Sequence, residues 1–248
     1  MTIEAHAKIN WTLEVLGVRP DGYHDLRSVV LPIAMHDTVT LEESENISCR
    51  MDSGDVRQEG NLAYRAAVAL RRATGCRFGA AIGIAKRIPM GAGLGGGSAD
   101  AAAVLNGLNG LWGLGLSKRD LCEIAADVGS DVPALTLGGP VLMEGRGERV
   151  TPFCPEMMGG VAGGAAQNGE SCVPDAGDIV VSVPPVFAST PKVYREFRES
   201  DRGLCHNDLQ PAAIRLYPGI LAAMRNLEAQ GLRRVAMSGS GSAVYGVR

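Results

Sequence analysis

The stretch "IPMGAGLGGGSADAA", residues 88–102, constrains the chain most, because it sets five glycines within seven residues directly before an Ala-rich segment. Glycine amides can approach a ligand closely, since no Cβ intervenes and a positive φ carries no steric cost. If a helix follows, its unpaired N–H groups and partial positive charge face the same space. The pattern predicts a phosphate-binding loop; a flexible loop before a core helix is the alternative.

Two common nucleotide motifs match this stretch only in part. Gly91, Gly93 and Gly96 satisfy G-x-G-x-x-G, but a basic, proline-containing segment separates them from the preceding apolar run. The window around Leu116 is also apolar, where the dinucleotide motif requires an acidic residue. In the Walker A pattern, Gly97 occupies the position of the lysine. We reject both motifs, so the positive charge for a phosphoryl group must come from elsewhere.

Residues 5–15 alternate strictly between apolar and polar side chains. The odd positions, from Ala5 to Val15, are apolar, and the even positions, from His6 to Glu14, are polar. A period of two predicts a strand with one buried face and one polar face. Lys8 lies on the polar face, where it is either a functional ammonium or a solvated lysine.

The rest of the chain mixes strands and helices. Strands are predicted over residues 28–43 (broken or edged at Pro32), 80–89, 138–153 as a hairpin, 178–185, and 233–247 as a strand–turn–strand. Helices are predicted over 61–75, from about Ser98 to 112, 117–129, 190–199 and 217–231. Since regular β-α-β alternation is lacking, this order predicts an α+β architecture.

Charge and cysteine content narrow the class of protein. The 248 residues carry a formal net charge of −3, which gives no general attraction to nucleic acid or anionic membranes. No apolar run approaches the length of a membrane span, and the six cysteines form no CxxC pair. We expect a cytoplasmic protein with reduced thiols, a small-molecule partner, and no nucleic-acid or membrane partner.

Several segments resemble one kinase family. "PMGAGLGGGSADAA" is similar to the second motif of the GHMP small-molecule kinases, whose phosphate loop likewise lacks the Walker lysine. "AHAKINWTLEVLGVRPDGYHDLRSVV" resembles the first motif of a branch that acts on a cytidine-containing alcohol, and "VGSDVP", "EGRGE", "NDLQPAA" and "SGSGSAVYG" follow in that branch's order. The resemblance covers Ala5 to Gly246. It implies an ATP-dependent kinase of isoprenoid precursor biosynthesis, with ATP as co-substrate and Mg²⁺ as cofactor.

The resemblance also assigns roles to individual residues. It places Lys8 near the acceptor hydroxyl and the γ-phosphate, and it makes Asp131 the general base; from the residues alone, an N-cap before Pro133 is the preferred interpretation of Asp131. The predicted ATP-binding residues are Asn61, Pro89, Met90, Gly91, Ala92, Gly93, Leu94, Gly95, Gly96, Gly97, Ser98 and Ala99. Ser98 is also the candidate Mg²⁺ ligand, and Asn61 is alternatively a helix N-cap.

Substrate-binding residues follow from the same resemblance. Asn10, Tyr23, His24 and Tyr194 are predicted to bind the substrate, with Tyr23 and His24 against the cytosine and Tyr194 on its opposite face. An aromatic ring on each face of a base is a favourable stack. Packing of Tyr194 into the core is the alternative.

The family pattern implies two lobes. Residues 1–155 are predicted as a ribosomal-protein-S5-like lobe with the ATP site, 156–178 as a glycine-rich linker or loop, and 179–248 as a shortened ferredoxin-like lobe. The strand at residues 244–247 is therefore expected to leave apolar surface or a sheet edge uncovered. Two alternatives stay open: a GHMP kinase for another alcohol, such as mevalonate or homoserine, or a truncated, non-catalytic nucleotide-binding protein.

Overall fold

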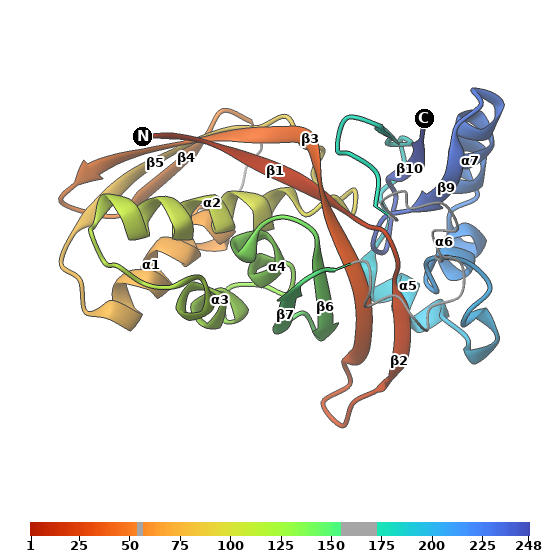
Figure 1. Cartoon of the computed structure of the whole chain (residues 1–248), viewed down its shortest axis with the longest axis horizontal. Coiled ribbons are helices and arrows are strands. Elements are labelled where there is room, and N and C mark those ends of the chain that lie inside the picture. Colours follow the sequence, from red (N-terminus) through yellow and green to blue (C-terminus); the bar gives the residue numbers. More distant parts are fainter. Residues whose placement is uncertain (54–56, 155–172) are drawn as a thin grey trace.

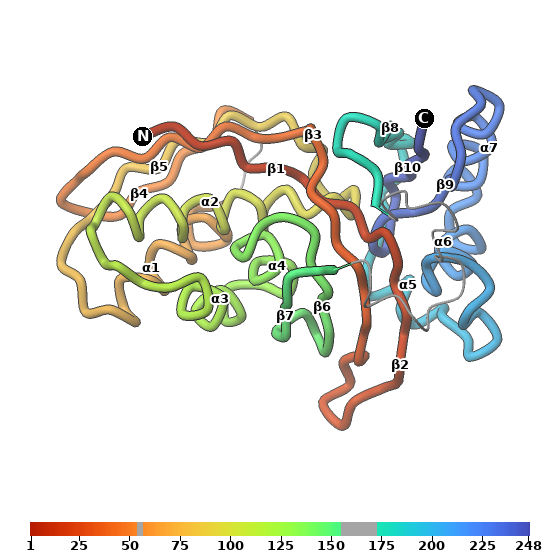
Figure 2. The backbone as a smooth tube through the Cα atoms, in the orientation of Figure 1, coloured from red at the N-terminus to blue at the C-terminus, as the bar shows by residue number. Residues whose placement is uncertain are grey.

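The computed structural model describes residues 1–53, 57–154 and 173–248, and Figures 1 and 2 show helices packed on two sheets in this part of the chain. The strands are β1 (Thr2–Asn10), β2 (Glu14–Val18), β3 (His24–Ser44), β4 (Ser48–Met51), β5 (Gly79–Ala85), β6 (Val141–Gly145), β7 (Arg149–Pro152), β8 (Ile179–Ser182), β9 (Arg233–Met237) and β10 (Val244–Val247). The α-helices are α1 (Leu62–Thr74), α2 (Gly96–Leu111), α3 (Lys118–Ala126), α4 (Val132–Leu137), α5 (Thr190–Glu196), α6 (Gln210–Leu216) and α7 (Gly219–Ala229). Short 3₁₀ turns cover Gln58–Gly60 and Glu199–Asp201. The α+β prediction is confirmed.

The long strand β3 organises the larger sheet. The order is β4-β5-β3-β6-β7, and β1 and β2 also pair with β3. Its first residues pair with β2 and β6, and its last residues pair with β5. The helices α1 to α4 lie on one side of this sheet in Figure 1, with α2 directly beneath β1 and β3.

Pro32 does not end β3, although the sequence predicted a break there. The strand runs through it, but the register with β1 shifts between the pairs His6–His36 and Lys8–Pro32. Because proline has no N–H to donate to a neighbouring strand, an irregularity in the β1–β3 pairing is expected at Pro32. The backbone N–H of Lys8 instead donates to Leu94 O at 3.0 Å, which ties β1 to the glycine loop.

The alternation in residues 5–15 holds for the apolar face and fails for the polar one. The odd residues from Ala5 to Val15 are all 3% exposed or less. However, Lys8, Asn10 and Thr12 on the even face are also buried, at 3%, 2% and 7% exposure. The chain also leaves the sheet between β1 and β2, so this region is two strands. A buried polar face requires internal partners for each side chain.

Local capping signals are confirmed. The Asn61 side chain accepts a hydrogen bond from Ala63 N at the start of α1, and Gly75 closes that helix with φ 66°. Ser117 and Asp120 form a reciprocal capping box at α3. These signals depend only on residues three or four positions apart, which is why sequence alone reveals them.

The smaller sheet has the order β8-β10-β9 and carries α5 to α7. The expectation that residues 244–247 leave an edge uncovered is wrong, because β10 pairs with β8 on one side and β9 on the other. Most of the proposed linker, residues 156–172, lies outside the described residues, and residues 173–178 form neither helix nor strand. The domain boundaries themselves stay a prediction.

A second apolar cluster joins the first strands to the C-terminal helices. Leu13, Val15 and Leu26 pack with side chains from α5, α6 and α7. Backbone hydrogen bonds strengthen this junction, since Leu13 N donates to His206 O at 2.8 Å and Asp208 N donates to Leu13 O at 2.9 Å. The β2–β3 hairpin is therefore part of the C-terminal core as well as of the larger sheet.

Tyr245→Phe should destabilise the protein. The Tyr245 hydroxyl, fully buried on β10, donates to Asn10 O at 3.2 Å and Trp11 O at 3.3 Å, and its ring stacks on Trp11. Removing the hydroxyl leaves buried carbonyl groups without this donor, so we expect the free energy of unfolding to fall by about 1–2 kcal/mol. Urea denaturation measures it. Tyr64→Phe on α1, outside this bridge, is the matched control, and equal losses for both variants would contradict the assignment.

Candidate active site

The glycine loop connects β5 to α2 and adopts a conformation that requires glycine. Gly93 and Gly95 have φ values of +79° and +70°. A side chain on Gly93 would lie 2.5 Å from Ser238 O, and one on Gly95 would lie 3.0 Å from Lys8 Cγ. The left-handed Gly95 caps α2, which begins at Gly96 and not near Ser98 as predicted. The first helical amides are therefore those of Gly96, Gly97 and Ser98.

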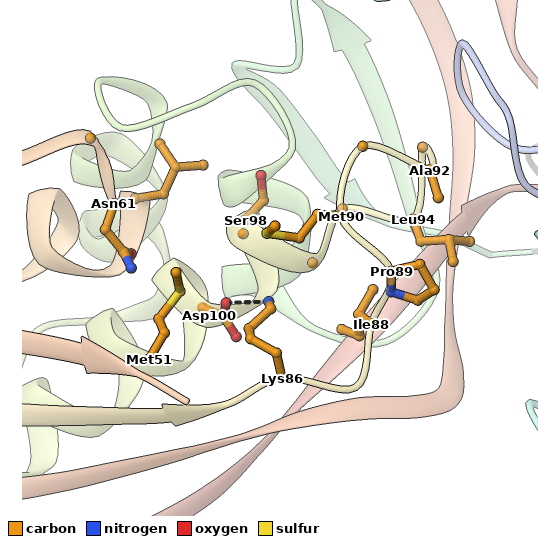
Figure 3. A pocket seen from close by; sticks show the side chains of 17 residues that line it. Met51, Asn61, Lys86, Ile88, Pro89, Met90, Ala92, Leu94, Ser98 and Asp100 are labelled. Atoms are coloured by element: carbon orange, nitrogen blue, oxygen red, sulfur yellow. Dashed lines mark hydrogen bonds and ion pairs between the residues drawn. The ribbon is translucent and has the colours of Figure 1, made fainter. Parts of the chain in front are cut away.

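A cavity of about 350 Å³ lies over this loop. Figure 3 shows it between the loop, the end of β4 at Met51 and the start of α1 at Asn61. The residues predicted to bind ATP line it from Pro89 to Ser98, together with Asn61. Ala99 lies elsewhere, on a separate cavity of about 260 Å³ between β1, β3, α2 and α4. The α2 N-terminus and the loop amides make this cavity suited to an anion.

Lys8 points its ammonium group toward a carboxylate beside the loop. Lys8 Nζ donates to Asn10 Oδ1 at 2.6 Å and lies 3.3 Å from Asp131 Oδ2. The Lys8 side chain is 3% exposed and the Asp131 side chain 31% exposed, so the pair is buried on one side and open on the other. Asn10 Nδ2 in turn donates to Ser28 Oγ at 2.8 Å, which fixes the amide.

Asp131 stands at the N-cap position of α4 but does not act as a cap. Its side chain makes no capping hydrogen bond to the helix. Pro133, inside the first turn, removes one of the amides that a cap would satisfy. The Asp131 carboxylate is therefore held toward Lys8 and the open side of the pair.

The C-terminal turn "SGSGS" closes over the same region. Ser238 Oγ donates to Gly93 O at 3.0 Å and accepts from Asn10 N at 3.3 Å. Ala243 N donates to Ala92 O at 2.9 Å. Asn207 Nδ2 holds this turn by donating to Met237 O and Gly239 O, both at 2.8 Å. Residues near both ends of the sequence thus fix the position of the glycine loop.

The predicted substrate aromatics fall into two groups. His24 and Tyr194 contact each other, with ring centroids 4.8 Å apart. Burial raises the pKa of Tyr194, and the negative charge of Asp131 adds to the rise; burial also lowers the pKa of His24. Tyr23 is 58% exposed, and the Arg146 guanidinium lies 4.9 Å above its ring. The His24–Tyr194 pair is thus partly buried, while the Tyr23 ring is exposed beside Arg146.

Lys86 forms a second buried ion cluster that the sequence did not predict. Its ammonium contacts Asp37 Oδ2 and lies 2.7 Å from Asp100 Oδ2. Asp37 is fully buried and Asp100 is 2% exposed. Burial raises the pKa of Asp100 to about 6, although Lys86 opposes this rise. The available signal was one aspartate inside the predicted strand over residues 28–43 and another inside the helix predicted from about Ser98.

No metal cluster or membrane span is present in the described residues. They contain no group of three or more His, Cys, Asp or Glu side chains able to hold a metal ion. The described helices are also too short or too polar to cross a bilayer.

Comparison with known proteins decides the family. Residues 61–139 match the GHMP kinases N terminal domain, and residues 190–247 match the GHMP kinases C terminal family. A protein of Symbiobacterium thermophilum named 4-diphosphocytidyl-2-C-methyl-D-erythritol kinase is 42% identical over 276 residues, covering 100% of this chain and 90% of the relative. The chain belongs to the GHMP kinase family.

Other relatives of this GHMP kinase agree. The protein of the same name from Pelotomaculum thermopropionicum is 38% identical, over 100% of this chain and 88% of its own length. A crystal structure of 4-(cytidine 5'-diphospho)-2C-methyl-D-erythritol kinase superposes with a TM-score of 0.78 at 34% identity, covering 100% of this chain and 90% of that chain. Homoserine kinase from Cytophaga hutchinsonii, at 17% identity and a TM-score of 0.63, covers 98% and 84% and shows the shared fold.

Asp100→Asn should change how the stability of this GHMP kinase depends on pH. The folded-state pKa of Asp100, about 6, lies above its ordinary value of 3.8, so the folded chain binds this proton more tightly than the unfolded chain. The resulting stabilisation is complete below pH 4 and is lost as pH rises through 6. Between pH 4.5 and 7.5 we expect the wild type to lose about 1–3 kcal/mol relative to Asp100→Asn.

Urea denaturation at several pH values measures this difference. The exposed Asp127, at the end of α3, provides the matched control variant Asp127→Asn. Stability curves for the wild type and Asp100→Asn that run parallel across this pH range would show that Asp100 is already charged at low pH.

Proposed function

We propose that this chain transfers the γ-phosphoryl group of ATP to the 2-hydroxyl of 4-diphosphocytidyl-2-C-methyl-D-erythritol, a step of non-mevalonate isoprenoid biosynthesis. The observation that carries the proposal is the buried Lys8 ammonium, 3.3 Å from Asp131, with the aliphatic part of the Lys8 side chain against the glycine loop at Gly95. The names of the relatives at 42% and 38% identity support the choice of substrate.

The proposed chemistry divides between the loop and the ion pair. The amides at the start of α2 and in the glycine loop hold the ATP phosphates. The Asp131 carboxylate, in the role of general base, takes the proton of the acceptor hydroxyl as that oxygen attacks the γ-phosphorus, and the bond between the γ-phosphorus and the β–γ bridging oxygen breaks to release ADP. Lys8, whose ammonium lies 3.3 Å from Asp131 Oδ2, stabilises the charge on the transferred group. A strand outside the loop thus supplies the lysine that Walker A places within it.

Mg²⁺ is part of the proposal. When bound with ATP, it neutralises charge on the phosphate oxygens. The Ser98 hydroxyl fits as its protein ligand, because Ser98 lines the cavity in the first turn of α2. Mg²⁺ needs few protein ligands where phosphate oxygens and waters complete its shell, consistent with the lack of a larger acidic cluster in the described residues.

We assign the substrate to the side of the pair that faces the aromatics. His24 and Tyr194 would contact the cytosine from the C-terminal helices' side, and Tyr23 would cover it from the hairpin tip. Asn10, held by Ser28 and hydrogen-bonded to Lys8, would orient the lysine and the acceptor alcohol. Asn61 would lie near the adenine, while its side chain also caps α1.

Asp131→Asn should abolish most turnover and leave ATP binding intact. Loss of a general base typically lowers kcat by about 10²- to 10⁴-fold. Because the Asp131 side chain makes no capping hydrogen bond to α4, its replacement tests the reaction and not the start of that helix. Steady-state ADP release with 4-diphosphocytidyl-2-C-methyl-D-erythritol measures it, and Asp127→Asn controls for a lost surface carboxylate. Near wild-type kcat in Asp131→Asn would remove Asp131 from the mechanism.

Tyr23→Ala should weaken binding of the cytidine substrate and leave ATP binding unchanged. Loss of one stacking face costs about 1 kcal/mol, which is a several-fold rise in the substrate KM. The KM for ATP should stay unchanged, because the glycine loop lies apart from the hairpin tip. The same assay, run with mevalonate and homoserine, tests the choice of alcohol. An equal rise in both KM values, or preferred turnover of another alcohol, would refute the substrate assignment.

A further inference from the structure

The ion cluster of Lys86 with Asp37 and Asp100 has no part in the transfer step described above. One ammonium group is shared by two carboxylates, and the three side chains are 6%, 0% and 2% exposed. Figure 3 shows Lys86 and Asp100 joined on the wall of the nucleotide cavity, below the glycine loop. Burial of three charged side chains beside a binding site is costly, so we ask what role this cluster has.

The cluster joins both ends of the glycine loop. Asp37 on β3 accepts hydrogen bonds through Oδ1 from Arg87 N at 2.5 Å and Ile88 N at 2.8 Å, so it fixes the segment that enters the loop. Asp100 lies one turn inside α2, where the loop ends. Lys86 pairs with both carboxylates. It therefore links the segment that enters the glycine loop, the helix α2 that follows the loop, and strand β3 of the larger sheet.

The ammonium group also lies against the start of α2. A side chain on Gly96, the first helical residue, would lie 3.4 Å from Lys86 Nζ and 2.9 Å from Ile88 Cγ2. The amides of this turn are the ones that face the cavity. A displacement of Lys86 would therefore move the helix terminus relative to the loop that precedes it.

A glycine-rich loop needs such support. Glycine loses more conformational freedom on ordering than any other residue, so a free loop would bind a polyphosphate weakly. Holding the loop in its bound shape before the ligand arrives raises affinity by removing that cost. Buried ion clusters often add little to stability compared with neutral replacements, but they impose a defined geometry.

We propose that Lys86 is the positioning residue of the nucleotide loop. Its ion pairs with Asp37 and Asp100 hold the two ends of the loop at the spacing that receives the phosphates. Lys86 thereby sets nucleotide affinity, while Lys8 and Asp131 determine the rate of transfer. This inference rests on the proposed nucleotide function of the cavity.

The test removes the whole cluster at once. Lys86→Met alone would leave two buried carboxylates without a counter-charge and could unfold the chain. The triple variant Lys86→Met, Asp37→Asn, Asp100→Asn leaves no buried charge, and Asn at position 37 keeps an oxygen to accept from Arg87 N and Ile88 N. Thermal unfolding establishes that the variant is folded, and calorimetric titration with Mg-ADP gives its nucleotide affinity.

We expect the triple variant to bind Mg-ADP about tenfold or more weakly than the wild type, with kcat at saturating ATP within about threefold. Lys86→Arg, which keeps the charge, should bind more tightly than the triple variant. Lys118→Met is the matched control: Lys118 Nζ joins α3 to Asn106 Oδ1 at 2.7 Å and Thr136 O at 2.8 Å, away from the loop. It should leave nucleotide affinity unchanged.

The outcomes separate the two proposals. A folded triple variant that binds Mg-ADP as tightly as the wild type overturns the positioning role and leaves the kinase proposal standing. A wild-type protein that does not bind Mg-ADP overturns both. If the triple variant does not fold, Asp100→Asn decides: a several-fold loss of Mg-ADP affinity without a loss of kcat supports the inference, and unchanged affinity defeats it.

Discussion

A lysine ammonium removed from water must find fixed partners within the protein, and the site is arranged around how Lys8 meets this requirement. Asn10 and Asp131 supply the oxygens, and the glycine loop covers the aliphatic part of the side chain at Gly95. The backbone N–H of Lys8 donates to Leu94 O at 3.0 Å, which ties the strand to the glycine loop. Lys8 thus contacts the glycine loop, the start of α4 and its own strand β1, and it fixes their relative positions.

The two buried lysines of this chain have opposite surroundings. Lys8 has one carboxylate, and that carboxylate is 31% exposed, so the pair remains accessible to a reacting group. Lys86 has two carboxylates, both almost fully enclosed, so little of its charge is available to a ligand. The accessible Lys8–Asp131 pair is therefore suited to a chemical role, and the enclosed Lys86 cluster is suited to a structural role.

Local features of the fold and site could be predicted from the sequence, while features that depend on distant residues could not. The caps of α1 and α3 and the glycine loop follow from neighbours in the chain. The apolar face of β1 follows from its period of two. The burial of Lys8 and Asn10 does not, because it needs the turn around Ser238 to fold back over β1. The cluster at Lys86 brings together positions 37, 86 and 100, and the sequence separations of these residues do not predict their contact. The residues that we propose for the transfer step follow only from the family resemblance.

The packing of Tyr245 on Trp11 has a consequence for how the chain acquires its structure. Trp11 lies near the beginning of the chain, and its stacking partner lies close to residue 248. The apolar side chains of Leu13, Val15 and Leu26, in and beside the β2–β3 hairpin, likewise pack in a cluster with C-terminal residues of α5 to α7 and of the smaller sheet. During synthesis, these N-terminal side chains leave the ribosome long before the surfaces that cover them. Contacts of such large sequence separation are slow to form. The nascent chain must therefore keep these apolar side chains of the hairpin without their packing partners until α5 to α7 have been synthesised.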